Sequence, residues 1–108
     1  MSNERLMQQV EQLENDSNYE GAYALCTNAL QTDFNNIDLL EKTAMLAKIV
    51  GHKEKCIEYW ERLLEISPSN QVAYYELQDL YLDTDKFKYY SMRAKYRIIE
   101  RKTEAALD

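Results

Sequence analysis

The sequence predicts an all-α protein made of three helix-turn-helix repeats, and three observations support this fold class. First, Gly21, Gly51 and Pro68 are the only residues of the two strongest helix-breaking types among 108. Second, Glu, Lys, Leu, Ala and Gln dominate the composition, and these residues favour helices. Third, small and apolar side chains recur at a spacing of 34 residues, a period typical of stacked helix pairs.

This spacing divides one domain, 1–108, into repeats of about 3–36, 37–70 and 71–104. Aligned residues share size or type, as in Asn36 with Asn70, Ala22 with Cys56, and Leu30 with Leu64. One helix pair cannot bury both of its apolar faces, so three pairs are expected to stack around a continuous core. The predicted architecture is an α-solenoid of about six antiparallel helices.

In the first repeat, helices are expected over 3–15 and about 18–31, because apolar residues recur there at helical spacing. Ser17, with Glu20 three residues later, is expected to cap the second of these helices. Asn36 is a natural N-terminal cap for the first helix of the next repeat.

In the second repeat, helices are expected over 37–50 and 53–66. Gly51 lies where a left-handed C-terminal cap is needed, and Pro68 cannot continue the second helix. In the third repeat, a short polar turn over 83–85 is expected to precede a long last helix, roughly 86–105.

The second repeat resembles a tetratricopeptide repeat in the spacing of Leu40, Ala44, Gly51, Cys56, Trp60, Leu64 and Pro68. The resemblance covers residues 3 to about 100 and implies a right-handed superhelical stack. It also implies that small residues such as Ala44 and Cys56 let paired helices approach closely. The third repeat departs from this pattern, because Tyr90 and Arg97 fall where small residues belong. A slip of one residue would place Ser91 and Ile98 there instead.

The resemblance further implies a binding function, because the first helices of such repeats line a concave groove. The matching positions are Met7, Glu11 and Glu14 in the first repeat, Asp38, Glu41, Lys42, Met45 and Ile49 in the second, and Val72, Tyr75, Glu76 and Asp79 in the third. This mixture of acids and apolar residues suits a partner segment with basic and apolar residues. The alternative is that the acids form only a solvated helix face.

The resemblance also carries a negative expectation. Some tetratricopeptide proteins hold the C-terminal carboxylate of heat-shock chaperones with Lys, Asn and Arg side chains. The matching positions here are Met7, Glu11, Lys42, Val72 and Glu76. Only one of these is basic, so we expect no carboxylate clamp for chaperone tails.

The last predicted helix differs in charge from the rest of the chain. Residues 86–108 contain seven bases and three acids, whereas residues 1–85 contain 16 acids and six bases. Two apolar stripes run along this helix, one through Phe87, Ala94, Ile98 and Ala105 and the other through Tyr89, Met92, Tyr96 and Ile99. The residues expected to dock onto a partner are Tyr89, Met92, Arg93, Tyr96, Arg97 and Ile99.

Three interpretations of this helix stay open. It is a partly exposed terminal helix, its lysine stems covering apolar surface. Alternatively, it docks onto a partner subunit or a second copy of the chain, which would make the protein a homo-oligomer or a complex subunit. Contact with nucleic acid is the least favoured, because the acidic remainder of the chain would repel phosphate.

Several kinds of chemistry are not expected. His52 is the only histidine and lies in a predicted turn, so no metal site is expected, and two glycines allow no phosphate-binding loop. No enzyme and no cofactor are therefore expected. Cys26 and Cys56 are interpreted as buried thiols, with a redox pair as the alternative. No apolar run long enough to span a membrane and no secretory start is present, which favours a cytoplasmic location.

Two functional hypotheses result. The first is an adaptor or assembly chaperone whose acidic groove binds a segment of a partner protein. The second is a structural subunit that docks into a larger complex through its basic and aromatic last helix.

Overall fold

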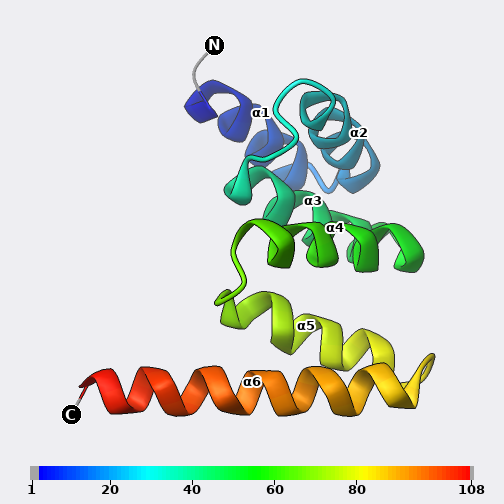
Figure 1. Cartoon of the computed structure of the whole chain (residues 1–108). Coiled ribbons are helices and arrows are strands. Elements are labelled where there is room, and N and C mark those ends of the chain that lie inside the picture. Colours follow the sequence, from blue (N-terminus) through cyan, green and yellow to red (C-terminus); the bar gives the residue numbers. More distant parts are fainter. Residues whose placement is uncertain (1–2, 108) are drawn as a thin grey trace. The chain divides into compact units, whose positions relative to one another are not determined.

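The computed structural model describes residues 3–107 and shows an all-helical chain (Figure 1). Its six helices are α1 Asn3–Asn15, α2 Tyr19–Leu30, α3 Ile37–Val50, α4 Lys53–Ile66, α5 Gln71–Leu82 and α6 Lys86–Leu107. No strand occurs within residues 3–107. The predicted fold class, all-α with six helices, is confirmed, and the predicted helix ends agree with the observed ones to within two residues.

Contacts divide the chain into two units, Met1–Tyr59 and Trp60–Asp108, and α4 contributes to both. In the first unit α2 packs against both α1 and α3. In the second unit α5 packs against the longer α6, and the two run antiparallel (Figure 1). Consecutive helices therefore pack in pairs, as a helix-turn-helix repeat requires.

Two asparagines separated by the repeat spacing begin equivalent helices. The Asn36 side chain accepts a hydrogen bond from the backbone N–H of Leu39 at 3.1 Å, and α3 follows it. The Asn70 side chain accepts from the backbone N–H of Ala73 at 2.9 Å, and α5 follows. Both bonds satisfy a backbone donor that the first turn of a helix cannot pair. The predicted cap at Asn36 is confirmed.

The predicted cap at Ser17 is wrong, because the cap of α2 is Asn18. Ser17 adopts a left-handed backbone, with φ of 59°, and closes the end of α1 instead. The Asn18 carboxamide then accepts from the backbone N–H of Gly21 at 3.0 Å. A Cβ atom at position 21 would lie 2.6 Å from the Asn18 side chain, so this cap requires the glycine.

Gly51 ends α3 in the predicted left-handed conformation, with φ of 87° and ψ of 17°. The backbone carbonyl of His52 then accepts from the N–H of Cys56 at 2.9 Å as α4 begins. Pro68 follows the end of α4 by two residues. Gly51, His52 and Pro68 therefore lie in the turns that were predicted for them.

The third repeat is shorter by one residue than the second. The carbonyls that accept the first hydrogen bond of α2, α4 and α6 belong to Asn18, His52 and Asp85, so the spacing falls from 34 to 33. The Asp85 carboxylate also accepts from the N–H of Lys88 at 3.1 Å. The residue matching Cys56 is therefore Tyr89. The predicted slip towards Ser91 and Ile98 is wrong, because the register shifts by one residue in the opposite direction, towards the N-terminus.

Each unit has its own buried side chains. In the first unit they are mostly small or aliphatic: Val10, Ala22, Cys26, Leu30, Leu39, Leu40, Thr43, Ala44, Leu46, Ala47 and Cys56. In the second unit they include aromatic residues: Trp60, Leu63, Ala73, Tyr74, Leu77, Leu80 and Tyr81. Both cysteines are buried thiols outside any disulfide, as predicted, and burial raises the pKa of the Cys26 thiol.

The buried polar groups of the first unit bond to helix carbonyls. The Thr43 hydroxyl donates to the backbone carbonyl of Leu39 at 2.6 Å. The Cys56 thiol donates to the carbonyl of Ala44 at 3.2 Å, which joins the start of α4 to α3. An unpaired buried donor costs about 1–3 kcal/mol, so both bonds stabilise the unit, and the Cys56 bond also favours the packing of α4 against α3.

We predict that Asn36→Ala lowers the free energy of unfolding by about 1 kcal/mol, because it removes the cap of α3. Urea denaturation followed by circular dichroism measures this change. Asn35→Ala is the matched control, since Asn35 is exposed in the same turn and does not cap the helix. An equal effect of both substitutions would show that the cap does not stabilise α3.

Candidate protein-binding faces

The face predicted in the first unit brings α1 and α3 together. The Lys42 ammonium of α3 lies 3.0 Å from a carboxylate oxygen of Glu14 on α1, and both side chains are partly exposed. Lys42 and Glu14 therefore lie on the same surface of the first unit, as the sequence analysis predicted. The ion pair also engages the one base among the predicted groove positions.

Acidic and apolar side chains alternate over this face. Met45 and Ile49, one turn apart on α3, are both exposed large hydrophobic residues. The remaining predicted positions of the first unit are either exposed (Glu11 and Asp38) or half-buried (Met7 and Glu41). A ligand on this face would meet apolar contact surface with carboxylates beside it.

In the second unit, α5 carries the equivalent face. Val72 and Tyr75 are exposed, and Tyr75 has 62% of its surface accessible. Leu82, further along the same side of the helix, is exposed as well. Asp79 is exposed and Glu76 is half-buried, and α5 contains no lysine or arginine. The predicted positions on α5 thus form a second acidic and apolar face.

The docking residues predicted on α6 divide between two sides of the helix. Tyr89, Met92, Tyr96 and Ile99 are half-buried on the side towards α5, and Met92 lines a shallow pocket with Tyr74 and Leu77. Arg93 and Arg97 are exposed. The most exposed apolar residues of α6 are instead Phe87, Tyr90 and Ile98. The stripe predicted to dock onto a partner therefore faces α5, and a different apolar stripe of α6 faces solvent.

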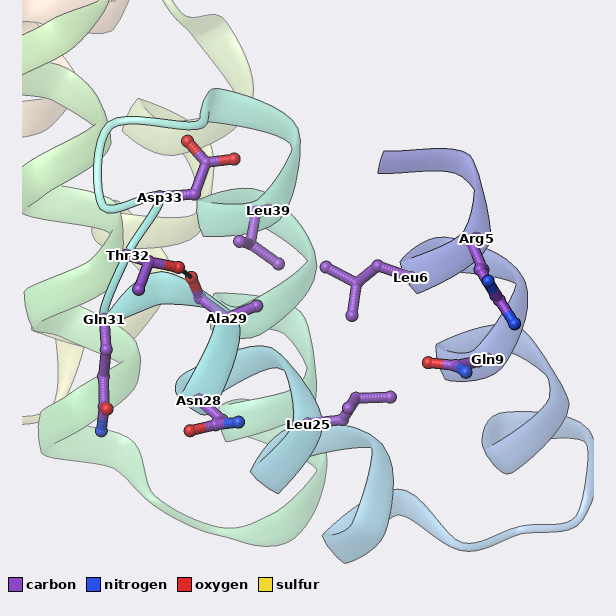
Figure 2. Close-up of a pocket in the computed structure, with 10 residues that line it drawn as sticks. All are labelled: Arg5, Leu6, Gln9, Leu25, Asn28, Ala29, Gln31, Thr32, Asp33 and Leu39. Carbon is purple, nitrogen blue, oxygen red and sulfur yellow. Dashed lines mark hydrogen bonds between the residues drawn. The ribbon is translucent and has the colours of Figure 1, made fainter. Parts of the chain in front are cut away.

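A pocket of about 630 Å³ in the first unit was not predicted. Figure 2 shows Leu6 on α1 pointing across a gap towards Leu25 on α2 and Leu39 on α3. Polar side chains, among them Arg5 and Gln9, surround this apolar floor. Sequence periodicity marks the three leucines as core residues, and it contains no information on how closely α1 approaches α2.

Two tyrosines have shifted acidities. Burial, followed by the neighbouring Glu61 carboxylate, raises the pKa of Tyr81 to about 12, and the Lys88 ammonium lies 5.5 Å from the centre of its ring. Burial, followed by a hydrogen bond with Tyr59, raises the pKa of Tyr23. The Tyr23 ring stacks on His52 at a centroid distance of 5.3 Å. These contacts fix the positions of the rings within each unit.

The described part of the chain contains no group of three or more His, Cys, Asp or Glu side chains that could hold a metal ion. Within the same residues, no helix combines the length and the apolar character that crossing a membrane requires. In comparisons with known proteins, no family model matches the chain and no curated protein matches it significantly.

We predict that stability falls as pH rises from about 10 to about 12, because the folded state holds the Tyr81 proton more tightly than the unfolded state does. Tyr81→Phe should make this part of the stability profile less steep, with Tyr23 contributing the remaining slope, as measured by urea denaturation at each pH. Tyr75→Phe, at an exposed ring, is the control. Equal slopes for Tyr81→Phe and the unmodified chain would contradict the assignment.

We also predict that Ala29→Leu raises the free energy of unfolding by about 1 kcal/mol, because Ala29 lines the pocket and a larger side chain fills it. Thermal unfolding monitored by circular dichroism measures the change. Ala24→Leu, at an exposed position of the same helix, controls for helix propensity. A lower melting temperature for Ala29→Leu alone would mean that α1 already closes against α2.

Proposed function

We propose that this chain is a non-enzymatic protein-binding module of the tetratricopeptide type, acting in the cytoplasm as an adaptor or assembly chaperone. In this proposal the helix pairs stack in a right-handed superhelix. The acidic and partly apolar faces of α1, α3 and α5 bind a segment of a partner protein. The segment carries basic residues that pair with the carboxylates and apolar residues that pack on the exposed side chains.

One observation carries this proposal: α3 and α5 expose large apolar side chains beside acids at the positions expected of groove residues. Isolated apolar residues on a surface need no explanation. Here, however, Met45 and Ile49 are one turn apart on α3, and Val72, Tyr75 and Leu82 follow one side of α5. A purely solvated face would not require such stripes, so a ligand that covers them accounts for both the charge and the apolar exposure.

The same contacts argue against capture of a chaperone carboxylate. Lys42, the one base among the matching positions, already forms an ion pair with Glu14. A carboxylate entering this face would have to displace Glu14 while facing Glu11 on the same helix. Since a carboxylate clamp requires several aligned donors, a ligand with basic side chains fits this face better.

A second candidate function, a structural subunit that docks through the C-terminal helix, has its own supporting observation. The exposure of Phe87, Tyr90 and Ile98 leaves one side of α6 apolar and uncovered within the described residues. This surface differs from the acidic faces in charge, so the two functions would use different ligands.

The proposed function is tested by reversing the charge of Glu41, Glu76 and Asp79 to lysine in one variant. Partners captured by the unmodified chain are identified by mass spectrometry, and their binding segments are then measured as peptides by calorimetry. We expect the triple variant to weaken binding of a basic, apolar peptide at least tenfold, since attraction becomes repulsion at three positions. The weakening should be smaller at high salt concentration.

The matched control reverses Glu54, Glu58 and Glu65, three exposed acids of α4, and so changes the net charge equally. It should retain most of the affinity, and circular dichroism checks the folding of both variants. Equal losses in the two variants would show that binding depends only on net charge and would exclude the acidic faces as the site.

A further inference from the structure

One side of α6 is apolar and faces solvent along about three helical turns. Phe87 has 84% of its surface accessible, and Tyr90, Ala94 and Ile98 are also exposed. Their spacing of three, four and four residues places them on a single stripe of the helix, which we call the outer stripe. The outer stripe extends about 17 Å along the axis, at 1.5 Å per residue.

The opposite side of α6 is already occupied. Tyr89, Met92, Tyr96 and Ile99 are half-buried on the side that packs against α5. Thr103 continues this side, and its hydroxyl accepts a hydrogen bond at 2.9 Å from the carboxamide of Gln71, at the start of α5. The rotation of α6 about its axis is therefore defined along most of its length, and the outer stripe cannot turn inwards.

Apolar exposure of this kind is not a general property of the helices at the ends of the described chain. Among its described residues α1 has no exposed large hydrophobic side chain, whereas α6 has three. The two helices therefore differ, because α6 has an apolar stripe that no described residue covers and α1 does not.

The charges beside the outer stripe define what that partner carries. By helical geometry the stripe is bordered on one side by Lys88, Lys95 and Lys102, all exposed. Of these, Lys88 also lies over the Tyr81 ring, and Lys95 lines a shallow pocket with Glu61 and Glu65 of α4. The other side carries Lys86, Arg93 and Arg97, with Glu100 and Glu104 near its C-terminal end. The helix as a whole contains seven bases and two acids. Apolar contacts between two rows of bases fit a helix with an apolar stripe and carboxylates on both flanks.

We propose that the outer stripe of α6 binds an acidic amphipathic helix of a partner protein. The apolar side chains of that helix pack on Phe87, Tyr90, Ala94 and Ile98, and its carboxylates pair with the flanking lysines and arginines. This surface and its ligand are distinct from the acidic faces of α3 and α5, and they define the chemistry of the partner for the second candidate function.

Two other occupants fit the charges less well. A second copy pairing through its own α6 would bring two strongly basic helices together, and like charges across an interface oppose association. Nucleic acid would gain from the bases and from the rings of Phe87 and Tyr90, yet the C-terminal half of the stripe, Ala94 and Ile98, offers no ring on which a base could stack. Both occupants are nevertheless included as outcomes in the test.

The test uses a designed amphipathic peptide of about 18 residues, with leucines on one stripe and glutamates elsewhere, and a second peptide with lysines in place of the glutamates. Binding to the full chain is measured by fluorescence anisotropy. We expect the glutamate peptide to bind, with an affinity that falls as salt rises. The double variant Tyr90→Ser with Ile98→Ser should weaken it about tenfold or more, since two apolar contacts are lost.

Tyr75→Ser is the matched control, because Tyr75 and Tyr90 are both 62% exposed on helices of the second unit. This substitution should leave the affinity for the glutamate peptide unchanged. The lysine peptide tests the acidic faces with the same variants, and there Tyr75→Ser should weaken binding while the double variant does not. Failure of one peptide therefore does not imply failure of the other, so the two proposals are tested separately.

A charge-swap variant tests the flanking bases. Arg97→Glu with Lys95→Glu should abolish binding of the glutamate peptide and add a second site for the lysine peptide, one that Tyr75→Ser does not weaken. No binding of the glutamate peptide, or equal binding to the double variant, overturns the proposal. Two other results would also overturn it. One is a dimer of the chain, detected by light scattering, that does not form in the double variant. The other is tight binding of a single-stranded RNA that the same substitutions abolish.

Discussion

The structure depends on the close approach of paired helices, which requires small side chains where their axes cross. In the first unit these places are filled by Ala22, Cys26, Ala44 and Cys56, all fully buried. The thiol of Cys56 reaches the carbonyl of Ala44 at 3.2 Å, a contact possible only because neither residue is large. Once these pairs form, the opposite sides of α1 and α3 are left towards solvent, and that is where the acidic and apolar groups lie.

Local sequence signals predicted the fold well because they act within a few residues. Asn36 pairs a backbone N–H in the first turn of α3, and Gly51 adopts the left-handed backbone that ends the same helix. Each effect needs only one residue of the right type, so the sequence alone is enough to predict it. The errors arose where two local solutions compete. Ser17 and Asn18 can both cap a helix, and the left-handed backbone at Ser17, which ends α1, leaves the cap to Asn18. No pattern in the sequence decides between such neighbours.

The candidate binding faces were predictable only in part, for a related reason. On α3 and α5 one side is clearly more apolar, so periodicity separates the buried side from positions such as Met45 and Tyr75. On α6 both sides are apolar, and periodicity cannot choose between them. The helix and turn from Asn70 to Asp85, together one residue shorter than their equivalents from Asn36 to His52, decide instead, because they bring Tyr89 rather than Tyr90 towards α5. The pocket beside Leu6 depends on the separation of α1 from α2, a tertiary property with no local signal.

The one-residue shortening has a consequence for charge as well as packing. A helix whose apolar stripe faces α5 through Tyr89, Met92 and Tyr96 must turn its second stripe and its bases outwards. The acids, by contrast, lie mainly on helices that precede Asp85 in the chain. Opposite charges are thus carried by different surfaces of one small protein. The two proposals therefore assign ligands of opposite charge to different surfaces of the chain.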